Sequence, residues 1–143
     1  MVAGKYNITC QQGSTFDLQL TLQYTNPDYP GDCADPNVCP EFLPWDLTDY
    51  TARMQVRKYI DSATKMLELT TENTTSYRIT LGNPDAVDGT ISLFIRAEDT
   101  RNNQFTPTSK LTSGVYDIEI ISPTNEVDRI LQGEFILSPE VTQ

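Results

Sequence analysis

Residues 14–24 read STFDLQLTLQY, and this stretch decides the class of fold. Apolar side chains occupy every second position from Phe16 to Tyr24, and polar side chains occupy the positions between them. Successive side chains of an extended chain point to opposite faces, so a period of two separates the two sets. The stretch therefore predicts a half-buried β-strand rather than a helix.

The same alternation returns in four later segments. Short segments at 65–70 (KMLELT) and 77–82 (YRITLG) also resemble strands, and polar turns separate them. A short helical turn is expected near Glu98, and Gly133 is expected to mark a bulge or a close approach. In each of the four alternating segments one row of apolar residues is expected to lie on one face of its strand. These rows are Ala52, Met54 and Val56; Ile91, Leu93 and Ile95; Tyr116, Ile118 and Ile120; and Val127, Leu131, Phe135 and Leu137.

About seven to nine short strands with turn signals between them predict an all-β fold. Residues 1–143 are expected to form one domain, because the length is typical of one and no internal repeat is found. Two sheets, each apolar on one face, bury those faces against each other, so an antiparallel β-sandwich is the economical architecture. A closed barrel is the alternative.

A proline-rich insertion at about 26–44 interrupts the strand pattern. It contains five prolines and two of the three cysteines, and a central strand cannot contain so many prolines. Three interpretations of Cys33 and Cys39 are open: a disulfide that closes this small loop, two free thiols, or part of a zinc site. Cys10 is expected to be buried in a strand. Clustered acids at Asp28, Asp32 and Asp35 could hold calcium or simply face water.

The insertion is unusually aromatic for a solvated segment. Tyr29, Phe42 and Trp45 lie in it or at its end, and a loop stiffened by proline loses little entropy on docking. These three residues are the candidate interface residues, because tyrosine and tryptophan are enriched where proteins bind each other. The alternative for Trp45 is a structural role, in which it packs over the sheet edge and anchors the loop.

Composition excludes several functions. The chain has 20 acidic and 10 basic residues, a net charge of -10, which disfavours binding to nucleic acid and to anionic membrane surfaces. It has no histidine, which removes Ser-His-Asp and Cys-His catalysis and histidine metal sites. Carboxylate pairs such as Asp46 with Asp49 or Glu68 with Glu72 have no recognisable catalytic frame, so we expect no enzyme and no cofactor.

Nothing in the sequence indicates a membrane or an export route. No run of 18 apolar residues is present, and the first residues lack the charged and apolar segments of a signal peptide. We expect synthesis in a cytosol, without export by the usual route.

The order of several segments resembles a family of small virion proteins of tailed bacteriophages. These segments are QGSTFDLQLTLQY, PWDLTDYTARMQVRKYI, DGTISLFIRAEDT and SGVYDIEIISPTNEVDRILQGEFILSPEVTQ, and together they extend over residues 11–142. The resemblance implies an immunoglobulin-like β-sandwich similar to the N-terminal domain of upper baseplate proteins and of tail-fibre adaptors. The insertion departs from the pattern, since a shorter hairpin is expected there.

The resemblance implies a non-enzymatic subunit of a phage particle, a baseplate or tail-fibre adaptor. Its partners would be other virion proteins, it would be present in several copies, and it would be assembled in the host bacterial cytoplasm. A capsid decoration protein is an alternative of the same class. A carbohydrate-binding module for host glycans and a glycan-degrading enzyme are alternatives of other classes; the first needs exposed coplanar aromatics, the second two convergent carboxylates.

Overall fold

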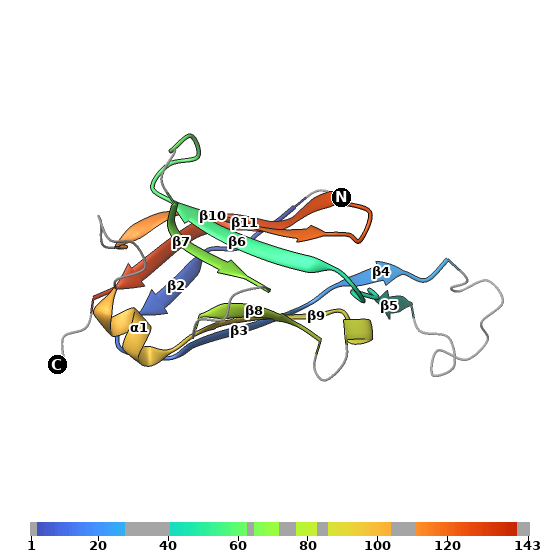
Figure 1. Ribbon diagram of the computed structural model, residues 1–143, viewed down its shortest axis with the longest axis horizontal. Helices are drawn as coiled ribbons and strands as arrows, with labels where there is room; N and C mark the ends of the chain where they lie inside the picture. The colour runs from blue at the N-terminus through green and yellow to red at the C-terminus, as the bar shows by residue number, and fades with distance from the viewer. Residues whose placement is uncertain are drawn as a thin grey trace.

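The computed structural model describes residues 3–27, 41–62, 65–71, 77–82, 86–103 and 111–139. Within these ranges the chain is mostly β-strand, with one short helix, α1 (Ala97–Asn102), and one 3-10 turn, η1 (Ala86–Asp88) (Figure 1). The all-β prediction is confirmed, and α1 lies at the expected helical turn. The strands are β1 (Gly4–Lys5), β2 (Ile8–Gln11), β3 (Phe16–Thr21), β4 (Gln23–Thr25), β5 (Phe42–Pro44), β6 (Thr51–Arg57), β7 (Lys65–Thr70), β8 (Arg78–Leu81), β9 (Thr90–Ile95), β10 (Ser113–Ile121) and β11 (Val127–Ser138).

Two of the sheets stack on each other and enclose the core (Figure 1). The larger sheet has the order β1-β11-β10-β6-β7, with β2 also paired to β11, and the smaller has the order β3-β9-β8. β1 and β2 run parallel to β11, and the other neighbours in both sheets are antiparallel. β4 and β5 form a separate two-stranded sheet. The described strands therefore form stacked sheets rather than one closed barrel.

The core consists of the inward rows of both stacked sheets. Burying one such aliphatic or aromatic side chain contributes roughly 1.5–3 kcal/mol, so the rows dominate the stability of the fold. Phe16 and Phe135 join the sheets across the core, with ring centroids 6.3 Å apart and planes at 73°. The predicted inward residues that are buried are Ala52, Met54, Val56, Ile91, Leu93, Ile95, Tyr116, Ile118, Ile120, Phe135 and Leu137.

The first predicted row, from Phe16 to Tyr24, is buried only in part. Its members on β3, an edge strand of the smaller sheet, pack against the core but are only half-buried. The strand is also interrupted at Leu22, which separates β3 from β4. Tyr24 lies beyond the stacked sheets and is 46% exposed, so its expected burial was wrong.

A bulge in β11 changes the parity of its first residues. β10 pairs Ile118 with Leu131 but Glu119 with Arg129, so Ile130 is an extra residue on β11. Ile130 is buried, and the positions before it point to the opposite face from the one expected. Val127 is consequently 51% exposed, and its predicted burial was wrong.

Gly133 allows the N-terminal segment, which runs parallel to β11, to approach it closely. A Cβ at this position would overlap the carbonyl oxygen of Tyr6 and lie 3.0 Å from Asn7 Oδ1. The same carbonyl accepts a hydrogen bond from the hydroxyl of buried Tyr116, and burial raises the pKa of Tyr116 to about 12. The predicted close approach at Gly133 is confirmed, whereas the bulge is at Ile130 instead.

Helix α1 closes one end of the sandwich through polar contacts. The buried Thr100 hydroxyl accepts a hydrogen bond from Gly13 N–H at 3.0 Å and lies 3.0 Å from the Ser14 carbonyl oxygen. Asn103 ends the helix in a left-handed conformation, with φ of 48°, and its buried amide bonds both backbone groups of Leu111. These buried polar groups are thus satisfied. No helix in the described ranges is long and apolar enough to cross a membrane.

The close approach of Tyr6 to Gly133 can be tested with two glycine substitutions. Gly133→Ala is expected to lower the free energy of unfolding by about 1–3 kcal/mol, because the new methyl group displaces the Tyr6 backbone. Gly4→Ala is the control, since a Cβ there meets its nearest atom, Leu131 Cδ1, at 3.4 Å. Urea unfolding should show a change below about 0.5 kcal/mol for the control. Equal effects of the two substitutions would contradict the close approach.

The inward rows can be tested by charge. Leu93 on β9 has no exposed surface, so Leu93→Asp buries an unpaired charge and should abolish the cooperative thermal transition. Leu20→Asp on the half-exposed edge row should leave a cooperative transition at a lower melting temperature. Circular dichroism during heating measures both. A cooperative melt of the Leu93 variant close to that of the unmodified chain would refute the assignment of the inner face.

Candidate interaction surfaces

Strands β4 and β5 form a two-stranded ribbon that extends beyond the stacked sheets (Figure 1). Tyr24 faces Leu43 across the ribbon, and Thr25 faces Phe42, so the two aromatic side chains lie on opposite faces. Tyr24 is 46% exposed and Phe42 is 49% exposed. The ribbon therefore presents an aromatic side chain on each face.

Trp45 belongs to the base of the ribbon. Its backbone N–H donates to the Leu22 carbonyl at 3.0 Å, and its half-buried side chain packs against the core. The indole Nε1 is buried and has no hydrogen-bond partner within the described part of the chain. This placement agrees with the anchoring role for Trp45, which was the structural alternative.

The remaining predicted site residues are placed as follows. Phe42 is in β5, so the end of the predicted insertion is a strand rather than a loop, and Pro44 fits there because β5 pairs on one side only. Tyr29, Cys33 and Cys39 lie outside the described residues, as do the acids at 28, 32 and 35. Cys10 is a buried free thiol on β2, as predicted, and burial raises its pKa to about 11.

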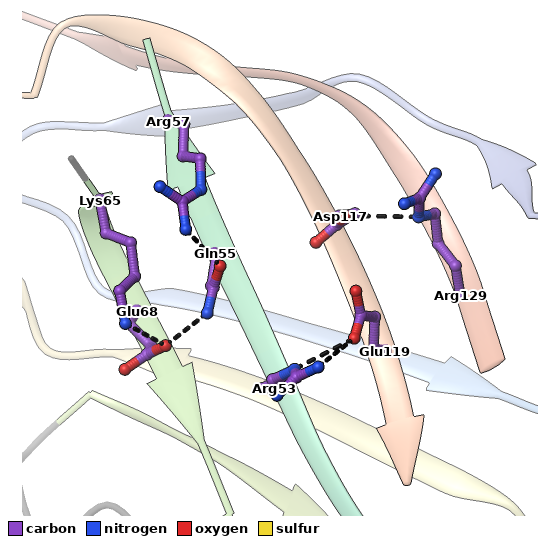
Figure 2. Close-up of polar contacts among 8 residues, drawn as sticks. All are labelled: Arg53, Gln55, Arg57, Lys65, Glu68, Asp117, Glu119 and Arg129. Carbon is purple, nitrogen blue, oxygen red and sulfur yellow. Dashed lines mark hydrogen bonds and ion pairs between the residues drawn. The ribbon is translucent and has the colours of Figure 1, made fainter. Parts of the chain in front are cut away.

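The outer face of the larger sheet bears a row of ion pairs across three strands (Figure 2). Arg53 on β6 donates to Glu119 Oε2 on β10 through Nε at 3.0 Å and Nη2 at 2.7 Å. Asp117 on β10 pairs with Arg129 Nε on β11 at 3.3 Å. These pairs connect neighbouring strands at a surface where exposed ion pairs contribute little free energy.

A second network connects β6 to β7 on the same face (Figure 2). Glu68 Oε2 accepts hydrogen bonds from Gln55 Nε2 at 2.7 Å and from Lys65 Nζ at 3.1 Å, and Arg57 donates to Gln55 Oε1 at 3.1 Å. Burial disfavours the charged form of Glu68, but the bonds from Lys65 and Gln55 outweigh it and hold its pKa below the usual value. Glu68 is thus a structural acceptor in this network.

A concavity of about 400 Å³ lies where β1, β6, β10 and β11 meet on this face. Burial, and secondly the nearby Glu119, raise the pKa of Asp117, which lines it. The mixture of cations and amides suits a small polar or anionic group. Its lining residues are Lys5, Asn7, Gln55, Arg57, Ile60, Val115, Tyr116, Asp117, Arg129, Gln132 and Gly133.

Two of the four carboxylates considered from the sequence, Asp46 and Glu68, have structural partners. Asp46 Oδ1 accepts hydrogen bonds from the Thr48 hydroxyl at 2.6 Å and the Thr48 N–H at 3.0 Å, and these bonds lower the pKa of Asp46. Glu72 lies outside the described residues. Within the ranges given above, no three cysteine, aspartate or glutamate side chains gather closely enough to hold a metal ion.

No protein-family model matches the chain, and no curated protein matches it in sequence.

The environment of Asp117 predicts the direction in which the free energy of unfolding changes with pH. Its pKa is raised on folding, so the carboxylate costs stability at neutral pH, and this cost disappears as the pH falls through the folded-state pKa. Asp117→Asn should change the free energy of unfolding by less than about 1 kcal/mol at pH 7, because an exposed ion pair is lost at the same time. The stability of the variant relative to the unmodified chain should decrease as the pH is lowered from 7 towards about 4. Urea unfolding at several pH values measures it; a relative stability that rises on acidification would contradict the raised pKa.

Proposed function

We propose that the chain is a non-enzymatic structural protein of a tailed-bacteriophage particle, a baseplate or tail-fibre adaptor that docks through the β4–β5 ribbon. The observation that carries the proposal is the ribbon itself. A two-stranded extension is only marginally stable by itself, and this one leaves an aromatic side chain exposed on each face. Aromatic side chains in such a position supply binding energy when a neighbouring subunit covers them.

The strand order supports the immunoglobulin-like interpretation that accompanies this proposal. In variable-type immunoglobulin domains one sheet contains strands B, E and D, and the other contains G, F, C and C′. The smaller sheet here follows the order β3-β9-β8, and the larger contains β11-β10-β6-β7, which is the same arrangement in the same chain order. Such a sandwich is a scaffold that leaves loops and edges available for neighbouring subunits.

A decoration protein on the capsid is the alternative of the same class, and the ribbon serves it equally well. A carbohydrate-binding module has less support. Phe94, the aromatic residue on the outer face of the smaller sheet, lies under the guanidinium of Arg78, whose centre is 5.2 Å from the ring centroid. A sugar would have to displace this stacked arginine.

The proposal is tested in particles of the virus that encodes the chain. Phe42→Ser should reduce the number of copies per purified particle several-fold, because docking loses an aromatic anchor. Immunoblotting of particles measures incorporation, and antibody labelling in the electron microscope distinguishes the tail from the capsid shell.

Val127→Ser is the matched control, since Val127 is 51% exposed and Phe42 is 49% exposed. Both variants should keep the free energy of unfolding within about 0.5 kcal/mol of the unmodified chain. Particles that lack the protein altogether would overturn the proposed function. Normal incorporation of the Phe42 variant would exclude the ribbon as the docking element.

A further inference from the structure

Strands β3 and β4 form one long edge whose outer side has no partner among the described residues. Leu22, between the two strands, donates its N–H to the Gly89 carbonyl at 2.8 Å and accepts the Trp45 N–H at 3.0 Å. The N–H and C=O of one strand residue point to the same side, so β9 and β5 follow each other along one side of residues 16–25. Within the described ranges, no strand pairs with the opposite side along this length.

The hydrogen-bond alternation identifies which backbone groups are open. Leu22 and Asn26 both donate to their partner strands, at 2.8 Å each, so the even-numbered residues face β9 and β5. In an antiparallel pair the intervening residues point their N–H and C=O groups away from that partner. The odd-numbered residues therefore present backbone groups that no other described strand pairs; they are Asp17, Gln19, Thr21, Gln23 and Thr25.

The core is also least covered along this edge. The inward residues Phe16, Leu18 and Leu20 are half-exposed, whereas their partners on β9 have at most 1% exposure. On the other edge strands most inward residues are exposed by 2% or less; they are Ile8 and Cys10 on β2, Leu67 and Leu69 on β7, and Ile79 on β8, whereas Leu81 at the end of β8 is partly buried. The sandwich is therefore less completely covered at β3, where all three inward residues are partly exposed, than at those edges.

Common protections against strand pairing are missing from this edge. Edge strands usually carry lysine, proline or a bulge that prevents another strand from pairing. Residues 16–25 contain no lysine and no proline, and the register with β9 is unbroken from Phe16 to Thr21. Asp17 is the single charged residue in this stretch.

The sequence of the edge is complementary to itself. Residues 16–24 read FDLQLTLQY, and the pattern of side chains is the same in both directions about Leu20. Antiparallel pairing of two copies centred there matches aromatic with aromatic and leucine with leucine, and it places no two charges opposite each other. The resulting pairs are Phe16 with Tyr24, Asp17 with Gln23, Leu18 with Leu22, Gln19 with Thr21, and Leu20 with Leu20.

We propose that two copies of the chain associate through this edge about a two-fold axis, joining their three-stranded sheets into one continuous sheet. Odd-numbered residues pair with odd-numbered residues in this register, so the open backbone groups of each copy satisfy those of the other. The contact also covers the half-exposed row and the exposed Tyr24. It is isologous, since the same patch is used by both copies. The proposal shares Tyr24 with the ribbon contact, but it does not require the virion role, because it is tested on the purified chain.

Two double variants test the register directly. Gln19→Lys with Thr21→Lys places like charges opposite each other at two symmetric positions, whereas Gln19→Lys with Thr21→Glu places opposite charges there. Both residues are exposed in the single chain, so neither variant should disturb the fold, which circular dichroism checks. Light scattering after size exclusion, and sedimentation over a wide concentration range, measure the mass against 16.1 kDa for one copy.

The unmodified chain and the Lys/Glu variant are expected to be dimers, and the Lys/Lys variant should dissociate at least about tenfold more readily. Each copy carries a charge of -10, so added salt should strengthen the dimer by screening repulsion. A chain that remains monomeric at every concentration and salt would overturn the proposal, as would any oligomer that the Lys/Lys substitutions leave unchanged. Neither result would bear on incorporation into particles.

Discussion

The apolar rows of the two sheets have to leave water together, and the rest of the structure depends on this constraint. Neither sheet can bury its inner face alone, so the rows centred on Met54, Leu93 and Ile118 are covered only when the sheets stack. The polar residues between them are then forced outward. On the larger sheet this produces the arginine and carboxylate network of the outer face.

The same constraint shows where the sandwich is unfinished. The central strands β6 and β10 of the larger sheet and β9 of the smaller sheet each face the other sheet, and their inward residues are buried. The edge strand β3 has cover on one side only, and its continuation β4 leaves the stacked layers altogether with Tyr24 exposed. Both proposed contacts, the ribbon and the paired edges, are places where an apolar pattern continues after the core has ended.

Much of the fold could be predicted because period-two patterning and burial agree residue by residue in long strands. Prediction failed where a local irregularity intervened: the extra residue Ile130 reversed the orientation of Val127, and no sequence signal marks that bulge. β1 and β5 were missed because each is too short to show a period, and prolines surround β5.

The candidate surfaces were harder to predict than the fold. The sequence marked Phe42 and Trp45 as candidate interface residues, but the structure separates them: Phe42 is exposed on the ribbon and Trp45 packs against the core. The boundary between them depends on Leu22, where the pairing partner changes from β9 to β5. The concavity beside Asp117 was missed because four strands contribute to it. Two of its lining residues, Gln55 and Arg57, alternate with the predicted inward row of β6, but this alternation alone does not indicate a concavity.

Native-state hydrogen exchange, followed amide by amide, tests the central claim most directly. If the two sheets are stable only as a stack, the slowest amides of β6, β9 and β10 should open with one common free energy, equal to that of global unfolding. The amides that join β4 to β5 should open with a lower free energy than those of the stacked sheets. Different opening free energies for the two stacked sheets, or ribbon amides as protected as those of β10, would contradict the account.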